Sequence, residues 1–131
     1  MAEAYIVAAA RTAGGRKGGR LAGWHPVDLA ASVLDALVER SGADPAQVED
    51  VIMGCVMQAG EQSNNVARNA VMASKLPESV PGTSIDRQCG SSQQALHFAA
   101  QAVMSGAMDV VIAAGVEIGR ASCRERVLAC V

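Results

Sequence analysis

Predicted strands alternate with helix-period segments along this chain, and that alternation restricts the possible folds more than any other feature. We expect strands at residues 5–10, 51–57, 83–86 and 110–116. Apolar residues recur at three- and four-residue steps in the predicted helices, residues 27–40, 66–73 and 90–106. A regular strand–helix alternation is typical of an α/β fold with a mainly parallel sheet and helices on its faces.

The composition supports one domain and argues against charged macromolecular partners. Half of the 131 residues are hydrophobic but only 2% are aromatic, so Ala, Val, Gly and Met must fill the core. The net charge is -2 and the pI is close to 5.6, which gives no electrostatic reason to bind nucleic acid or an anionic membrane.

The cysteine pattern and the lack of long apolar stretches indicate a cytoplasmic protein. The four cysteines, at positions 55, 89, 123 and 130, form no Cys-x-x-Cys pair, so neither a zinc site nor a disulfide framework is predicted. The sequence shows no secretory signal, and its apolar stretches are far shorter than the roughly 20 residues of a membrane helix. We therefore expect no membrane and no nucleic acid as partner.

Helix boundary signals are clear in the first half of the chain. Pro26 suits the opening turn of the helix at 27–40, and Ser41 and Gly42 close it. Asp44 is the expected cap of a short helical turn beginning at Pro45. The glycine-rich basic stretch before this helix, residues 14–20, lacks the Gly-Lys-Ser/Thr order of a phosphate-binding loop, so it is interpreted as a surface loop.

Cys89 is the leading candidate for a chemical role because it lies at the start of the helix predicted at 90–106. Unpaired backbone N–H groups and the helix dipole favour an anion there, and a thiolate in such a position is a usable nucleophile. Gly90, Ser91 and Ser92 leave the sulfur accessible. The alternative, a buried structural cysteine, remains open from position alone.

Several stretches, in order, resemble the N-terminal half of thiolases. They are IVAAART at 6–12, EDVIMGCV at 49–56, NNVARNA at 64–70, DRQCG at 86–90 and DVVIAAGVE at 109–117. The resemblance implies that residues 1–117 form the first βαβαβαβ half of the thiolase fold. It also implies that Cys89 is the residue that becomes acylated.

The activity implied by the resemblance is acyl transfer between coenzyme A thioesters. This covers thiolysis of a 3-ketoacyl-CoA and the reverse condensation of acetyl-CoA, with acyl-CoA and coenzyme A as partners. Coenzyme A is a substrate in that chemistry, and no metal or redox cofactor is expected. The parent protein is expected to be a homodimer or homotetramer.

Neither histidine is predicted to assist Cys89. Thiolases carry a catalytic Gly-His-Pro, but Trp24 precedes His25 here and the family motif lies far downstream. His97 follows Cys89 by eight positions, about 12 Å by axial rise alone, which exceeds hydrogen-bond reach. Both are interpreted as structural.

Three further polar residues have a structural and a functional interpretation. Cys55 falls within the strand predicted at 51–57, and packing is the preferred role. Asn64 and Asn65 precede a predicted helix, so a helix-start role is favoured over orientation of the nucleophile loop.

Two other functions compete with the thiolase interpretation. A β-ketoacyl synthase shares the fold and the cysteine nucleophile, but Arg87 and Gln88 before Cys89, with Gly90 after it, favour a thiolase. A non-catalytic thiolase-like scaffold is the alternative from another class, and the presence of Cys89 argues against it.

The last residues depart from the family pattern. The decapeptide IGRASCRERV at 118–127 resembles the in-frame translation of a DNA-sequencing adapter, and 128–131 has no explanation. We expect 118–131 to be non-native and unstructured, and we assign no function to Cys123 or Cys130. Because the family's Asn-Glu-Ala-Phe, Gly-His-Pro and Cys-x-Gly motifs do not occur in the sequence, we expect this chain alone to be inactive.

Overall fold

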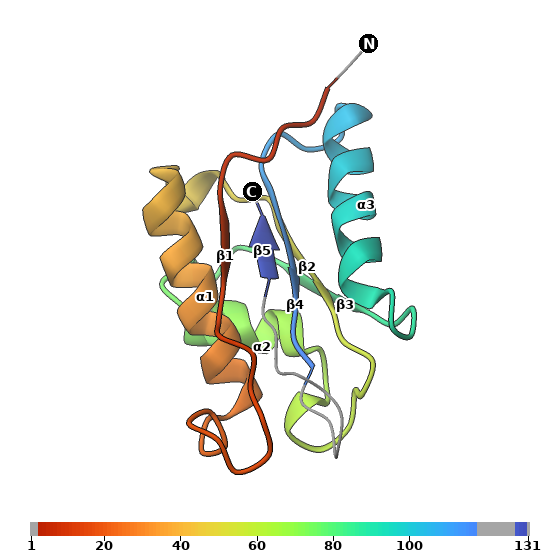
Figure 1. Cartoon of the computed structure of the whole chain (residues 1–131). Coiled ribbons are helices and arrows are strands. Elements are labelled where there is room, and N and C mark those ends of the chain that lie inside the picture. Colours follow the sequence, from red (N-terminus) through yellow and green to blue (C-terminus); the bar gives the residue numbers. More distant parts are fainter. Residues whose placement is uncertain (1–2, 118–127, 131) are drawn as a thin grey trace.

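The computed structural model describes residues 3–117 and 128–130, which form one five-stranded sheet with helices on both faces (Figure 1). The strands are β1 (Ala9–Arg11), β2 (Asp50–Gly54), β3 (Gly82–Ile85), β4 (Val111–Gly115) and β5 (Leu128–Cys130). The helices are α1 (Pro26–Ser41), α2 (Val66–Ala73) and α3 (Ser91–Met104), with 3-10 turns η1 (Pro45–Gln47) and η2 (Gly60–Gln62).

The sheet is built around a parallel core. Its strand order is β1-β5-β4-β2-β3, and β2 pairs parallel with both β3 and β4. Every residue of β4 is buried, as expected for a parallel strand covered on both faces. The predicted α/β class, with a parallel core to the sheet, is therefore confirmed.

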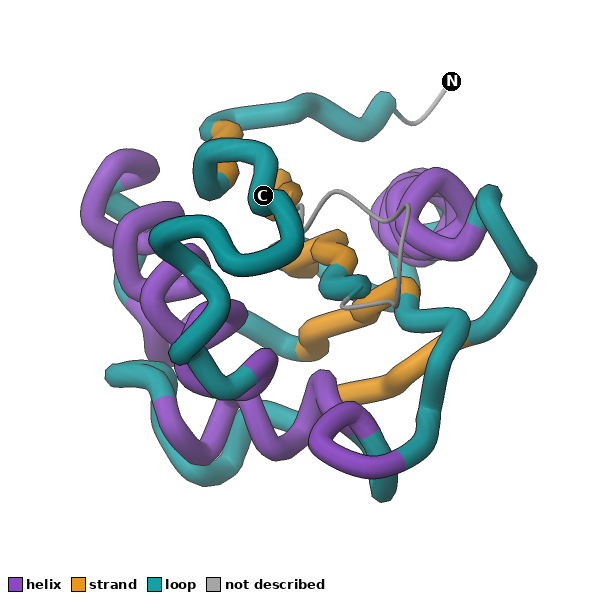
Figure 2. The backbone as a smooth tube through the Cα atoms, turned by 60° about the horizontal axis from the view of Figure 1, so that its bottom comes forward, coloured by secondary structure: helices purple, strands orange, loops and turns teal. Residues whose placement is uncertain are grey.

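Helices α1 and α2 cover one face of the sheet, and α3 covers the other (Figure 2). Side chains alternate between the two faces along β2, because Val51 and Met53 pack with α1 and α2 whereas Ile52 packs with α3. The α3 side is made mainly of small residues such as Ala95 and Ala99, so this helix approaches the sheet closely.

The predicted boundaries of α1 are confirmed. Pro26 occupies its first turn, and Gly42 ends it in the left-handed conformation with φ of 67°. The Gly42 N–H donates to the Val38 carbonyl over 3.1 Å, which satisfies one of the last carbonyls of the helix. Asp44 caps the short turn η1, accepting the Ala46 N–H at 2.9 Å.

Two strand predictions are wrong in extent. The strand expected at 5–10 is reduced to β1, and Tyr5, Ile6 and Val7 are 73%, 63% and 66% exposed. These residues precede the outermost strand, and none of the strands that the structure describes pairs with them. The strand expected at 51–57 ends at Gly54. The Cys55 N–H still donates to the Ile85 carbonyl at the end of β3, but the Glu117 carboxylate accepts the N–H groups that follow, those of Val56 and Met57.

The expectation of an unstructured tail is wrong for residues 128–130. They form β5, which pairs antiparallel with β1 on one side and β4 on the other. Strand edges present rows of unpaired N–H and C=O groups, and backbone pairing with them makes little demand on sequence. The adapter-like residues 118–127 lie outside the described part of the chain.

Candidate active site

Cys89 lies where the prediction placed it, directly before the N-cap residue of α3. Gly90 is that N-cap, and α3 runs for 14 residues from Ser91. The thiol is exposed to solvent. Because β2 and β3 are parallel, the loop from β3 to α3 carries Cys89 to the carboxyl end of the sheet, the usual location of ligand sites in open α/β proteins (Figure 1).

The loop before Cys89 has a specific backbone conformation. Gln88 has a φ of 49°, in the left-handed region that non-glycine residues seldom adopt. The Asp86 carboxylate accepts the Gln88 N–H at 2.8 Å, and the Gly90 N–H donates to the Arg87 carbonyl over 3.0 Å. These bonds form a tight turn that presents Cys89 at the mouth of the helix.

Arg87 is also anchored through its side chain. Its Nη1 donates to Oε1 of Gln94, one turn into α3, over 2.7 Å. The residue before the turn is thereby tied to the helix that follows it. This bond connects the first turn of α3 to the loop that carries Cys89.

Two glycines let α3 begin directly against the sheet. A Cβ on Gly54 would lie 2.3 Å from the Ser91 carbonyl carbon, and one on Gly115 would lie 2.6 Å from the Ser92 Cβ. Gly54 and Gly115 are register partners on β2 and β4. The role of these glycines in admitting α3 was not predicted, although a glycine that ends a strand is a known signal of close backbone approach.

Cys55 occupies the opposite environment and is confirmed as a packing residue. It is 1% exposed, and its N–H donates to the Ile85 carbonyl over 2.9 Å. Burial raises the pKa of the Cys55 thiol to about 11, with smaller contributions from the negative charges of Glu117 and Asp86. Cys55 is therefore a neutral thiol at physiological pH.

Glu117 is a second residue whose role the sequence analysis missed. Its Oε2 accepts the Val56 N–H at 2.7 Å and the Met57 N–H at 3.3 Å. The carboxylate thus ties the residue after β4 to the segment after β2. No local pattern reveals such a contact, because the partners are about sixty positions apart.

The helix-start role predicted for Asn65 is confirmed. Its Oδ1 accepts the Arg68 N–H at 3.2 Å at the start of α2. The same side chain reaches β3, where Nδ2 donates to the Gly82 carbonyl over 2.7 Å and Oδ1 accepts the Ser84 hydroxyl at 3.0 Å. Asn64 lies beside it with a φ of 58°.

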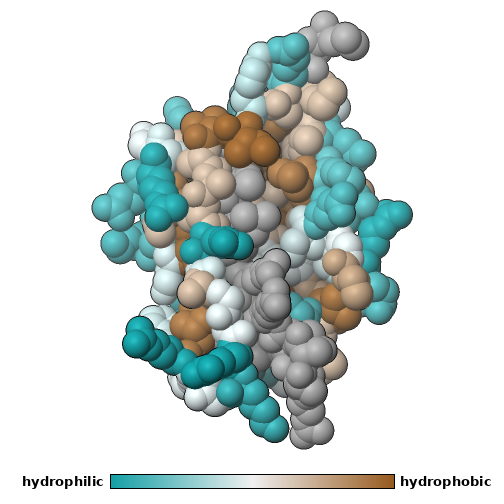
Figure 3. Space-filling view, in the orientation of Figure 1, coloured by the Kyte–Doolittle hydropathy of each residue, from teal (hydrophilic) through white to brown (hydrophobic). Residues whose placement is uncertain are grey.

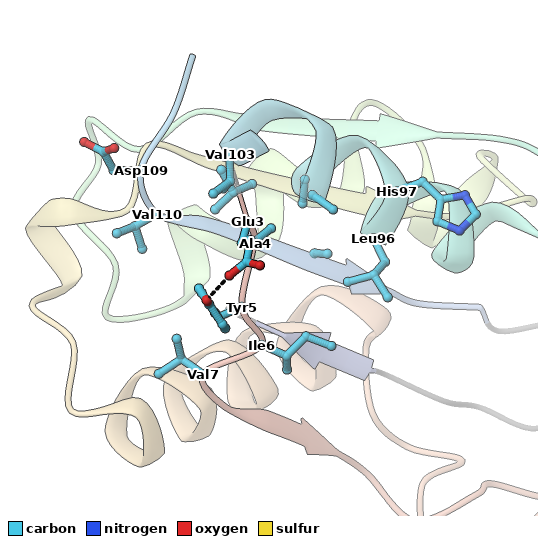
Figure 4. Close-up of a pocket in the computed structure, with 14 residues that line it drawn as sticks. Glu3, Ala4, Tyr5, Ile6, Val7, Leu96, His97, Val103, Asp109 and Val110 are labelled. Atoms are coloured by element: carbon cyan, nitrogen blue, oxygen red, sulfur yellow. Dashed lines mark hydrogen bonds between the residues drawn. The ribbon is translucent and has the colours of Figure 1, made fainter. Parts of the chain in front are cut away.

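The two histidines lie in other parts of the fold. His25 is the N-cap of α1, where its Nδ1 accepts the Val27 N–H at 3.2 Å. His97 lies on the exposed side of α3, at the rim of an apolar cavity of about 450 Å³ between that helix and the N-terminal segment (Figure 4). Neither position supplies a proton acceptor for Cys89.

No residue of the Cys89 loop lines this cavity. Its walls come from Leu96 and Val103 of α3, from Val110, and from Ile6 and Val7 of the exposed N-terminal segment. A hydrogen bond between Tyr5 and Glu3 lies at its edge. Apolar surface is also visible beside the N-terminal segment in the space-filling view (Figure 3).

Within 3–117 and 128–130, no group of three or more His, Cys, Asp and Glu side chains is placed to hold a metal ion. No helix in that part of the chain is long and apolar enough to cross a membrane.

An exposed cysteine at the start of a helix, at the carboxyl end of a parallel sheet, defines an α/β domain with a candidate nucleophile. The family model for the thiolase N-terminal domain matches residues 4–126. The chain belongs to the thiolase family.

Known relatives agree with this family. Over 117 residues the chain is 56% identical to the steroid 3-ketoacyl-CoA thiolase FadA6 of Mycobacterium tuberculosis, and over 118 residues it is 49% identical to a beta-ketoadipyl-CoA thiolase of Escherichia coli. Each match covers 89% of this chain and 29% of the relative.

A solved structure is similar as well. The crystal structure of the Bacillus anthracis acetyl-CoA acetyltransferase matches with a TM-score of 0.84 and 34% identity, covering 95% of this chain and 36% of that one. The chain thus spans about a third of the length of the proteins it resembles.

Proposed function

We propose that the protein transfers acyl groups between coenzyme A thioesters and that Cys89 carries the acyl group. The observation that supports this most directly is the exposed cysteine at the start of α3, in the segment that resembles the thiolase nucleophile. The relatives' names, 3-ketoacyl-CoA and beta-ketoadipyl-CoA thiolase, support a 3-ketoacyl-CoA as the substrate class.

The proposed reaction has two balanced steps. The Cys89 thiolate attacks the 3-keto carbon, the bond between carbons 2 and 3 breaks, and acetyl-CoA leaves after its carbanion takes a proton. Coenzyme A thiol then attacks the acyl-cysteine thioester, releasing acyl-CoA and the Cys89 thiol. Covalent capture divides one difficult cleavage into two easier steps and predicts ping-pong kinetics.

The start of α3 is suited to the charges that develop in these steps. Backbone N–H groups in the first turn of a helix have no carbonyl partner within the helix, and the helix dipole places positive potential there. The same potential favours the thiolate of Cys89 and an oxyanion formed on the attacked carbon. The tight turn at Gln88 holds the sulfur in this field.

Further parts of the proposal follow from the family resemblance. Coenzyme A acts as substrate with no metal or redox cofactor, the protein works in the cytoplasm, and the parent is a homodimer or homotetramer. The 131-residue chain does not turn over by itself, because its sequence contains no Gly-His-Pro or Cys-x-Gly motif to supply the acid–base steps.

Intact-mass spectrometry of the full-length parent after exposure to acetoacetyl-CoA tests this function. We expect one acetyl group per chain, removed again when coenzyme A is added, and none on a Cys89→Ser variant. Cys55→Ser is the matched control, since it removes a thiol that is buried in the fold. This variant should still be acetylated on Cys89. A chain that takes up no acetyl group is a scaffold, and the proposal is then wrong.

A further inference from the structure

The buried hydroxyl of Ser91 makes hydrogen bonds to the backbone of the two residues that precede Cys89. Ser91 is the first residue of α3 and is 4% exposed, one of two buried polar residues among those the structure describes. Its Oγ accepts the Arg87 N–H at 2.8 Å and donates to the Gln88 carbonyl over 2.6 Å. One hydroxyl therefore satisfies a donor and an acceptor at once.

We propose that Ser91 is a positioning residue for the Cys89 nucleophile, an inference that rests on the proposed acyl transfer. Its bonds hold the two residues before Cys89, and the Gln88 carbonyl also accepts the Ser91 N–H at 3.1 Å. The Gln88 backbone is left-handed, with φ of 49°, a conformation that is unfavourable for a non-glycine residue. The Ser91 hydroxyl and the Asp86 carboxylate stabilise this conformation.

The start of α3 lies directly against the sheet, which restricts the position of Ser91. The Ser91 backbone rests on β2, where a Cβ on Gly54 would come within 2.3 Å of its carbonyl carbon. The Ser91 hydroxyl therefore reaches the loop before Cys89 from the first residue of α3, at the point where that helix lies against β2. In this geometry Ser91 acts on the nucleophile through the backbone, without touching substrate.

Alkylation of Cys89 by iodoacetamide tests the role without requiring turnover. In the 131-residue chain, Ser91→Ala should slow alkylation about tenfold at pH 7, because the two lost hydrogen bonds are together worth somewhat more than the roughly 1.4 kcal/mol of a tenfold change. Ser91→Thr, which keeps the hydroxyl, should react at the rate of the unaltered chain.

Two comparisons separate positioning from stability. Ser105→Ala removes a similar hydroxyl–carbonyl bond, from Oγ to the Ala102 carbonyl at 2.9 Å, at the far end of the same helix, and should leave alkylation unchanged. Ser91→Val has the shape of Ser91→Thr without the hydroxyl and should react slowly, like Ser91→Ala.

The outcomes are distinct. Equal alkylation rates in Ser91→Ala and Ser105→Ala would overturn the positioning role. Loss of helical circular dichroism in both Ser91→Ala and Ser91→Val, with Ser91→Thr folded, would also overturn it, because the hydroxyl would then serve folding. Slow alkylation of Ser91→Ala, together with a full-length parent that accepts no acetyl group from acetoacetyl-CoA, would leave the positioning role intact and refute the proposed function.

Discussion

Cys55 and Cys89 lie at the same end of the same sheet, yet their surroundings differ in every respect that controls thiol chemistry. Cys55 follows β2, is 1% exposed, and has a pKa raised to about 11 by burial and nearby carboxylates. Cys89 follows β3, is exposed, and precedes the N-cap of a helix. The comparison indicates that backbone placement, and not residue type, determines which of the two thiols is the candidate nucleophile.

The largest expected effect comes from removing the exposed sulfur in the full-length parent. Cys89→Ser should lower acetylation by acetoacetyl-CoA at least about a thousandfold, since a hydroxyl without a strong neighbouring base is a poor nucleophile at neutral pH. Cys55→Ser should retain the acetylation rate. A Cys89→Ser chain that still becomes acetylated would place the nucleophile elsewhere.

Displacing α3 from the sheet should have the next largest effect. Gly54→Ala adds a Cβ that would lie 2.3 Å from the Ser91 carbonyl carbon, so the start of the helix must shift. We expect a loss of about 3 kcal/mol in the free energy of unfolding, measured with urea, together with slower alkylation of Cys89.

Gly23→Ala is the matched control, because a Cβ at Gly23 meets no atom within 4 Å. It should change the free energy of unfolding by less than about 1 kcal/mol. Equal destabilisation by the two substitutions would show that α3 does not rest on β2 as the structure indicates.

The buried cysteine should make stability fall at high pH. Its pKa is raised from 9.0 to about 11 in the folded state, so the unfolded chain loses this proton first as the pH increases. Stability contributed by the neutral thiol is complete below pH 9 and is lost between about pH 9 and 11. Urea titrations should show the chain losing stability relative to Cys55→Ala over this interval, whereas parallel curves would contradict the raised pKa.

The smallest expected effect concerns the carboxylate between the two regions. Glu117→Gln weakens the bonds to the Val56 and Met57 N–H groups, and we expect a loss of about 1 kcal/mol in the free energy of unfolding. It also removes a negative charge that raises the pKa of Cys55, so alkylation of Cys55 should begin at lower pH. Glu39→Gln, on the exposed side of α1, should change neither quantity.

Local signals allowed much of the fold to be predicted. Pro26 and Gly42 bound α1, Asn65 caps α2, and the continuous apolar run at Val111–Gly115 is a buried parallel strand. The position of Cys89 before α3 also followed from the helix-period pattern. In each case the physical cause lies within a few residues of the feature.

The errors concern features that depend on distant partners. The exposed segment at Tyr5, Ile6 and Val7 contains residue types that favour strands, but none of the described strands lies beside it to pair with it. The strand β5 exists because β1 and β4 leave room for it between them. The contacts of Glu117 likewise arise only when the sheet assembles, so no local pattern contained them. The glycine at 54 is a local signal of close backbone approach, but its partner, Ser91, is not marked in the sequence.

A peptide-resolved mass spectrum of the full-length parent after brief exposure to acetoacetyl-CoA at pH 7 is the most direct test of Cys89 as the acylated residue. Tryptic cleavage separates the two thiols, since Arg68, Lys75 and Arg87 lie between Cys55 and Cys89. The account predicts acetyl label on the peptide that begins at Gln88 and none on the peptide that holds Cys55. Label on Cys55, or equal label on both, would contradict it.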